Sequence, residues 1–328
     1  MRRLPFRLSR LMGLAIAVAV ATHAAGCAAR GGPSFDGPYA VVLGTAQDGG
    51  FPQIGCAEPP CAEARRDPAR RRLVSSLLVA DPRAGTRSRV DATPDLPEQV
   101  ERARTHPATR VARGPRPPLF DGVLLTHAHV GHYLDLAHFG REIYGAERLP
   151  VFASERFARF LTTNGPWSLL ASSRAIDLRV ARPDRPIALG EGLTATPLLV
   201  PHRDEFSDTF GYVVRGPRRA LLYIPDIDKW ERWDRRLEDV LATVDVALVD
   251  GTFAEDGEIP GRSMAEIPHP FVAETLRRLA TLPLAERAKV RFTHLNHTNP
   301  ATDPRSRVAA DVRAMGCAVA EDGEIHEL

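Results

Sequence analysis

The sequence predicts an α/β protein in which two groups of strands carry helices on their outer faces, an αββα sandwich. Short apolar, β-prone runs fall into two groups along the chain, and segments with helical spacing lie between and after them. Metal-ligating side chains directly follow several of these runs, so loops at strand ends should gather them along one edge. With 328 residues, of which 44% are hydrophobic, the chain can bury a substantial core.

The first group of elements comes before residue 165. Its expected strands are Val41–Leu43, Leu73–Ala80, Val123–Leu125 and Val151–Ala153, and its expected helices are Tyr133–Tyr144 and Glu155–Asn164. Between the second and third strands, Pro82 to Pro118 is rich in Arg, Pro and Thr and has no sustained period. We interpret residues 82–118 as a surface insertion.

The second group of elements fills the rest of the chain. Its expected strands are Leu193–Val200, Gly211–Val214, Ala220–Ile224, Val246–Val249 and Val290–Thr293. Two helices, Phe271–Ala280 and Val308–Met315, are expected to cover them.

The N-terminus has the features of an export signal. Four arginines within the first ten residues precede an apolar stretch, Leu11 to Ala21, which is too short to span a membrane comfortably. Ala24-Ala25-Gly26-Cys27 then resembles a bacterial lipobox, whose Cys carries the lipid. We predict a lipoprotein-type signal peptide over 1–26, a short linker over 27–38 and one folded domain over 39–328. The protein is then exported and anchored to a bacterial membrane through Cys27, facing the periplasm or the cell exterior. An ordinary secretory signal cut near Ala25 is the alternative.

Charge and cysteine content restrict the function further. The chain has 43 Lys and Arg against 41 Asp and Glu, and residues 1–26 hold four of the basic residues and no acidic one. The remainder is therefore slightly acidic, and nucleic-acid binding is not expected. In an exported protein, Cys56 and Cys61 either close a short disulfide loop or stay as free thiols. Cys317 lies in an apolar run and is expected to be buried.

The strongest functional signal is a set of histidines after strands. The segment 126–132 reads Thr-His-Ala-His-Val-Gly-His, and His202, Asp226 and His294 each follow a later apolar run. His and carboxylate are the ligands of catalytic zinc, which keeps one position open for water. An Asp shared by two groups of His suits two metal ions about 3.5–4 Å apart.

This ligand order resembles that of the metallo-β-lactamase superfamily, H-x-H-x-D-H followed by His, Asp and His. The resemblance implies that His127, His129 and His202 hold a first metal ion, that Asp226 bridges, and that His132 and His294 hold a second. Within the superfamily, the glycine-rich turn at 43–53 and the segment Thr-His-Leu-Asn-His-Thr-Asn-Pro at 293–300 resemble the pyrroloquinoline quinone biosynthesis protein B-like subgroup. That second segment favours His294 over His297 as the ligand.

One position departs from the superfamily pattern. Gly131 stands where the motif has Asp, which normally binds the second metal ion. The second site is therefore expected to be the weaker one, and Gly131→Asp to strengthen it. Asp135 and Asp208 are possible substitutes for the missing ligand. Asp48 is either an acceptor for a ligand His or only a turn residue.

Two further residues are weighed as neighbours of the site. Arg203 either binds an anionic substrate group or forms an ion pair with Asp204 or Glu205. His269, between two prolines, is expected to start a helix, and lining the pocket is the alternative.

The resemblance implies a metal-dependent hydrolase that uses a metal-activated water on a small-molecule ester, lactone, amide or phosphodiester. Asp226 would orient the nucleophile, and His132 or His297 would assist proton transfer or stabilise the oxyanion. We expect one or two Zn(2+) ions, with Fe or Mn as alternatives. An iron-dependent oxidoreductase related to cofactor biosynthesis and a non-catalytic, lipid-anchored metal-binding protein are the other hypotheses.

Overall fold

The computed structural model describes residues 35–104, 106, 118–261 and 263–328. The signal peptide and Cys27 predicted above lie outside these residues, as do most of the predicted linker and residues 107–117 of the predicted insertion. Among the residues described, no helix combines the length and the apolar composition that crossing a membrane requires.

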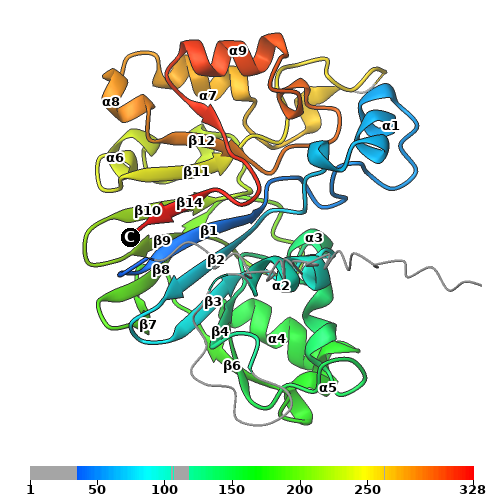
Figure 1. Ribbon diagram of the computed structural model, residues 1–328, viewed down its shortest axis with the longest axis vertical. Helices are drawn as coiled ribbons and strands as arrows, with labels where there is room; N and C mark the ends of the chain where they lie inside the picture. Colours follow the sequence, from blue (N-terminus) through cyan, green and yellow to red (C-terminus); the bar gives the residue numbers. More distant parts are fainter. Residues whose placement is uncertain (1–34, 105, 107–117, 262) are drawn as a thin grey trace, which may run out of the picture. The chain divides into compact units, whose positions relative to one another are not determined.

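Two seven-stranded sheets form the centre of the fold (Figure 1). The first sheet has the order β14-β1-β2-β3-β4-β5-β6, with bounds β1 Tyr39–Gly44, β2 Ser76–Asp81, β3 Thr86–Val90, β4 Gly122–Leu124, β5 Leu149–Ala153, β6 Ile176–Val180 and β14 Ile325–Glu327. The second has the order β13-β12-β11-β10-β9-β8-β7, with bounds β7 Ile187–Gly190, β8 Leu193–Val200, β9 Thr209–Arg215, β10 Ala220–Ile224, β11 Val246–Asp250, β12 Val290–Thr293 and β13 Ala318–Val319. Both sheets mix parallel and antiparallel pairs.

Helices flank the sheets. The helices are α1 Pro59–Arg66, α2 Leu96–Ala103, α3 Val130–Tyr133, α4 Glu155–Thr163, α5 Trp167–Ser172, α6 Leu237–Leu241, α7 Val272–Leu279, α8 Leu284–Arg287 and α9 Arg307–Ala314. In Figure 1, α2, α4 and α5 lie beside β3–β6, and α7–α9 lie beside β11 and β12. The predicted αββα architecture is confirmed.

Alternation along β1 shows how the core is layered. Ala40 and Val42 pack with Phe210 and Leu221 of the second sheet, and so fill the space between the sheets. Val41 and Leu43, the intervening residues, pack in the cluster that contains α2 and α4 residues. Because successive side chains of a strand point to opposite faces, a strand buried on both faces is apolar throughout. This is why β1 and β10 were evident in the sequence.

The expected surface insertion at 82–118 is wrong for the part that the structure describes. Residues 86–90 form β3, which pairs with β2 on one side and β4 on the other. Arg89 is fully buried, and its guanidinium donates to Asp91 O at 2.5 Å, Ser76 Oγ at 2.9 Å and Gln99 Oε1 at 2.6 Å. A strand whose buried side chains include hydrogen-bonded arginines lacks the apolar pattern by which strands are predicted.

The segment expected to be one helix over Tyr133–Tyr144 is also different. It contains only the end of α3, followed by a tighter 3-10 helix over Leu134–Phe139. The short turn of α3 begins directly after His129 and brings His132 back toward the edge of the sheet.

Candidate metal centre

Strand direction explains why the predicted ligands meet. In the first sheet β1 and β3 are both antiparallel to β2, and β3 is parallel to β4, so β1, β3 and β4 run in the same direction. In the second sheet β8, β10, β11 and β12 share one direction. Polar residues stand at the carboxyl ends of these seven strands, namely Asp48, Asp91, the 127–132 histidines, His202, Asp226, Asp250 and His294.

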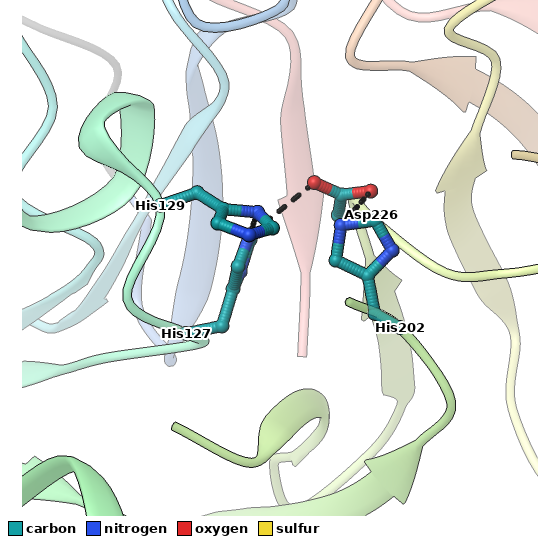
Figure 2. Close-up of side chains that lie close together, drawn as sticks. All are labelled: His127, His129, His202 and Asp226. Carbon is teal, nitrogen blue, oxygen red and sulfur yellow. Dashed lines mark hydrogen bonds and ion pairs between the residues drawn. The ribbon is translucent and has the colours of Figure 1, made fainter. Parts of the chain in front are cut away.

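The first cluster consists of His127, His129, His202 and Asp226, whose ligand atoms all lie within 4.8 Å of one another. Figure 2 shows the His127 and His129 rings on one side and the His202 ring on the other, with the Asp226 carboxylate beside the His202 ring and one of its oxygens directed toward the other two rings. His127 Nε2 is 2.9 Å from His129 Nδ1 and 3.3 Å from Asp226 Oδ2. His202 Nε2 is 3.3 Å from Asp226 Oδ1.

The second cluster consists of Asp48, His132 and His294. The Nε2 atoms of His132 and His294 are 3.3 Å apart, and Asp48 Oδ1 lies 3.5 Å from the first and 3.8 Å from the second. Asp226 Oδ2, which faces His127, is also 3.8 Å from His132 Nε2 and 3.9 Å from His294 Nε2. Asp226 therefore lies between the two clusters, where the sequence placed a bridging carboxylate.

Each predicted ligand histidine is oriented by a hydrogen bond from its other ring nitrogen. The pairs are His127 with Thr126, His129 with Glu205, His132 with Asp91, His202 with Asp228 and His294 with Thr252, at 3.0, 2.8, 2.8, 3.2 and 2.9 Å. Each partner is an oxygen that accepts the ring N–H, which leaves the nitrogen facing the clusters with its lone pair. Such partners fix the tautomer and the ring orientation of metal ligands.

Buried atoms without partners show that these residues fit a metal ion. His202 Nε2, Asp226 Oδ1 and Asp48 Oδ1 are inaccessible to solvent and have no hydrogen-bond partner in the described part of the chain. Buried polar atoms are normally paired, because leaving them unpaired costs free energy. Imidazole nitrogens with carboxylate oxygens are a common donor set for a divalent metal ion.

Electrostatics favour the ligand forms that a metal ion needs in the first cluster. Burial lowers the pKa of His127 well below its usual range. Burial alone would raise the pKa of Asp226, but His202, His269 and His294 hold it well below its usual range. At His132, burial is outweighed by the carboxylates of Asp91, Asp48 and Asp226, which raise its pKa to about 9.

His269 and Asp250 lie at the site; the sequence analysis gave pocket lining only as the alternative for His269 and did not name Asp250. His269 Nδ1 lies 2.8 Å from Asp250 Oδ2 and 3.1 Å from Asp226 Oδ1, and these three residues form a third cluster. Burial lowers the pKa of His269, but Asp250 and Asp226 outweigh it and raise the pKa to about 9. The expectation that His269 starts a helix is wrong, since α7 begins at Val272. Asp250 stands at the end of the apolar strand β11, much as Asp226 follows β10. This pattern in the sequence could have identified Asp250 as a site residue.

Three other predicted residues lie apart from these clusters. His297 is held by the Asn296 side chain at 2.8 Å and belongs to none of the clusters that the described residues form. Asp135 lies 3.4 Å from His138, and neither Asp135 nor Asp208 joins a cluster. The structure thus gives no support to either as the substitute for the missing motif carboxylate.

The loop after β8 bears on the two alternatives for Arg203, which were binding an anionic substrate group and forming an ion pair with Asp204 or Glu205. Arg203 is exposed and forms no ion pair with Asp204 or Glu205 in the described structure. Glu205 instead accepts from His129, and Asp204 accepts from Thr209 at 3.1 Å. Burial lowers the pKa of His129, although the Glu205 carboxylate beside it acts to raise it.

Comparison with known proteins identifies the family. Residues 86–298 match the beta-lactamase superfamily domain. Coenzyme PQQ synthesis protein B of Methylobacterium nodulans is 30% identical over 313 residues, covering 87% of this chain and 98% of the relative. The same protein from Azotobacter vinelandii is 30% identical over 311 residues, covering 86% and 97%.

Solved structures agree on the fold. Zn(2+)-bound PqqB from Methylobacterium extorquens superposes with a TM-score of 0.74 at 24% identity, covering 88% of this chain and 100% of that one. A diphosphatase from the PhnP family superposes with a TM-score of 0.60 at 23% identity, covering 89% and 97%. The chain therefore belongs to the beta-lactamase superfamily, has the metallo-β-lactamase fold, and falls in the PqqB-like group.

Proposed function

We propose that this protein is a metal-dependent hydrolase of a small-molecule substrate. The observation that carries the proposal is the first cluster, where donors from three separate strand ends converge on one point and their outward nitrogens are already bonded. A divalent metal ion bound there lowers the pKa of a coordinated water toward 7 and polarises the electrophile. Hydrolysis of an ester, lactone, amide or phosphodiester is the reaction that such a centre supports.

The protein residues then have distinct tasks. Asp226, with both oxygens directed at histidine nitrogens of the site, orients the attacking water. His269 holds Asp226 in place, because its Nδ1 lies close to the carboxylates of both Asp226 and Asp250. Arg203, exposed directly after His202, binds an anionic group of the substrate, since a guanidinium matches carboxylate or phosphate geometry.

The test combines metal analysis with a substrate panel. We expect the purified protein to carry a divalent metal ion and to hydrolyse at least one member of a panel of esters, lactones, amides and phosphodiesters. His202→Ala should lose metal and activity together, whereas Asp208→Ala, which removes a carboxylate outside the clusters, should keep both. Full metal content with no turnover across the panel would instead favour a non-catalytic metal-binding protein.

We propose Zn(2+) as the metal ion, because three His and one Asp are donors of the kind that catalytic zinc uses. The names of the relatives place those proteins in coenzyme synthesis, and an iron-dependent oxidoreductase related to cofactor biosynthesis is the second candidate. His and carboxylate ligands also suit iron. Elemental analysis of protein purified without added metal separates these two candidates, and iron together with oxygen consumption would replace the hydrolase.

We also propose that the protein is exported and anchored through Cys27. The basic and apolar segments before Cys27 support this, and so does the Cys56–Cys61 disulfide, because disulfides persist in oxidising compartments. Cys27→Ser should move the protein from the membrane fraction to the soluble fraction. Unchanged membrane partition would exclude the lipid anchor.

A further inference from the structure

Asp48 occupies the space in which a side chain at position 131 would begin. A Cβ built on Gly131 would lie 1.9 Å from Asp48 Oδ1 and 2.6 Å from Asp48 Cγ, so the two side chains cannot coexist in this arrangement. Position 131 is where the superfamily motif has its metal-binding Asp. We propose that Asp48 is the transposed ligand, which supplies from the loop after β1 the carboxylate that the motif has lost. This inference rests on the metal binding assumed under the proposed function.

The contacts of Asp48 are those of a ligand rather than of a structural turn residue. Its Oδ1 is buried without a hydrogen-bond partner in the described structure, although about a third of the side chain, 32%, remains exposed. Both neighbouring ring nitrogens, His132 Nε2 and His294 Nε2, face it at 3.5 and 3.8 Å. The opposite nitrogens of those two rings are bound to Asp91 and Thr252. Three potential metal-ligand atoms therefore face one point, at separations longer than good hydrogen bonds.

Backbone hydrogen bonds fix the loop that carries Asp48. Ala46 N–H donates to Leu73 O at 2.8 Å, and Gln47 N–H donates to Leu295 O at 2.9 Å. Gly50 N–H closes the turn on Gln47 O at 2.8 Å. Because Leu295 directly follows His294, the same bonds that position the turn also position a second ligand of the cluster.

This assignment changes the charge balance of the second site. With Asp48 and the shared Asp226, two carboxylates and two histidines, which a bound metal ion keeps neutral, surround the second site, and this is the charge that the family motif supplies. The expectation of a weaker second site, based on the missing Asp, then no longer holds. Gly131 becomes a requirement, since its hydrogen atom leaves room for Asp48.

Metal stoichiometry tests the proposal without any substrate. Metal-free wild type, Asp48→Ala, Asp48→Asn and the matched control Asp208→Ala are titrated with Mn²⁺ by calorimetry, and the spin coupling of the bound ions is read by electron paramagnetic resonance. Wild type and Asp208→Ala should bind two ions that share a bridging carboxylate and are therefore spin-coupled. Asp48→Ala should keep one ion, with the affinity for the second reduced at least about 10-fold, the scale lost when even an outer partner of a ligand is removed.

Folding and first-site affinity are the internal controls. Circular dichroism should be unchanged, and Asp48→Asn, which has the same shape, serves if Asp48→Ala fails to fold. Two coupled ions of wild-type affinity in both Asp48 variants would overturn the proposal, and so would a single ion in the wild type or an equal loss in Asp208→Ala. Since no turnover is measured, failure of the hydrolase proposal would appear only in the substrate panel.

Discussion

The substitution Asp91→Asn tests whether Asp91 orients the metal ligand His132, because it should leave the surrounding fold intact. Asp91 is fully buried at the end of β3 and has a φ of 66°, a left-handed conformation that Asn adopts readily. Its carboxylate accepts the Thr126 N–H at 2.8 Å, the Thr126 hydroxyl at 2.9 Å and the His132 Nδ1–H at 2.8 Å. The substitution therefore leaves backbone and volume unchanged and alters one acceptor oxygen and one charge.

The magnitude follows from these contacts. The amide oxygen can still serve Thr126, but an NH₂ group then faces His132 Nδ1. Either that nitrogen loses its acceptor, or the ring proton moves to Nε2, the nitrogen that faces Asp48 and His294. Loss of such a partner lowers metal affinity about 10–100-fold. One lost hydrogen bond to a charged group should lower the free energy of unfolding of the metal-free protein by about 1.5–3 kcal/mol.

Two measurements check this prediction. Competition with a chromophoric chelator gives the metal affinity, and urea unfolding of the metal-free protein gives the free energy of unfolding. Asp177→Asn is the control, because Asp177 is half-exposed and, among the described residues, forms its ion pair with the exposed Arg179, so it should change stability by no more than about 0.5 kcal/mol. Wild-type metal affinity in Asp91→Asn would refute the argument that Asp91 sets the His132 tautomer.

Three further predictions concern space, loop anchoring and pH. Gly131→Asp should lose the second metal ion rather than gain it, because its Cβ would also lie 2.7 Å from Asp48 Cα, and metal titration would contradict this by showing tighter binding. Arg156 donates to three backbone carbonyls of residues 204–207, so Arg156→Ala should raise KM while metal content stays near wild type, as kinetics and elemental analysis can show. Burial lowers the pKa of His326 to about 4, against about 6.5 in an unfolded chain. The contribution of His326 to the free energy of unfolding is therefore complete above pH 6.5 and is lost as the pH falls toward 4. Between pH 7 and pH 5, the free energy of unfolding of His326→Gln should fall by up to about 2 kcal/mol less than that of wild type, as urea unfolding can measure.

Much of this fold was predictable because most of its strands are apolar on both faces. Val246–Val249 and Ala220–Ile224 were expected as strands, and β11 and β10 contain them. β3 was missed because the buried side chains of Arg87 and Arg89 satisfy their charges through tertiary hydrogen bonds that no local pattern reveals.

The site residues, like the strands, include some that were predictable from the sequence and some that were not. The ligand order 127, 129, 202 and 226 was predictable, because these residues follow three apolar strands, with His127 and His129 after the same one, and strands of one direction bring their carboxyl ends to one edge. The role of Asp48 was not, since it depends on the packing of one loop against another. Asp91 was missed together with β3, and for His269 the role at the site was only the alternative, because its loop has no regular pattern.

The second cluster takes its three side chains from the loops after β1, β4 and β12. These loops are far apart along the chain, and β1 also pairs with β14 at the C-terminus. A growing polypeptide therefore has no complete second site until β12 has been synthesised and docked. On the Asp48 assignment, the second ion binds tightly only to the finished molecule, where it adds to the backbone hydrogen bonds that already join the loop after β1 to Leu295.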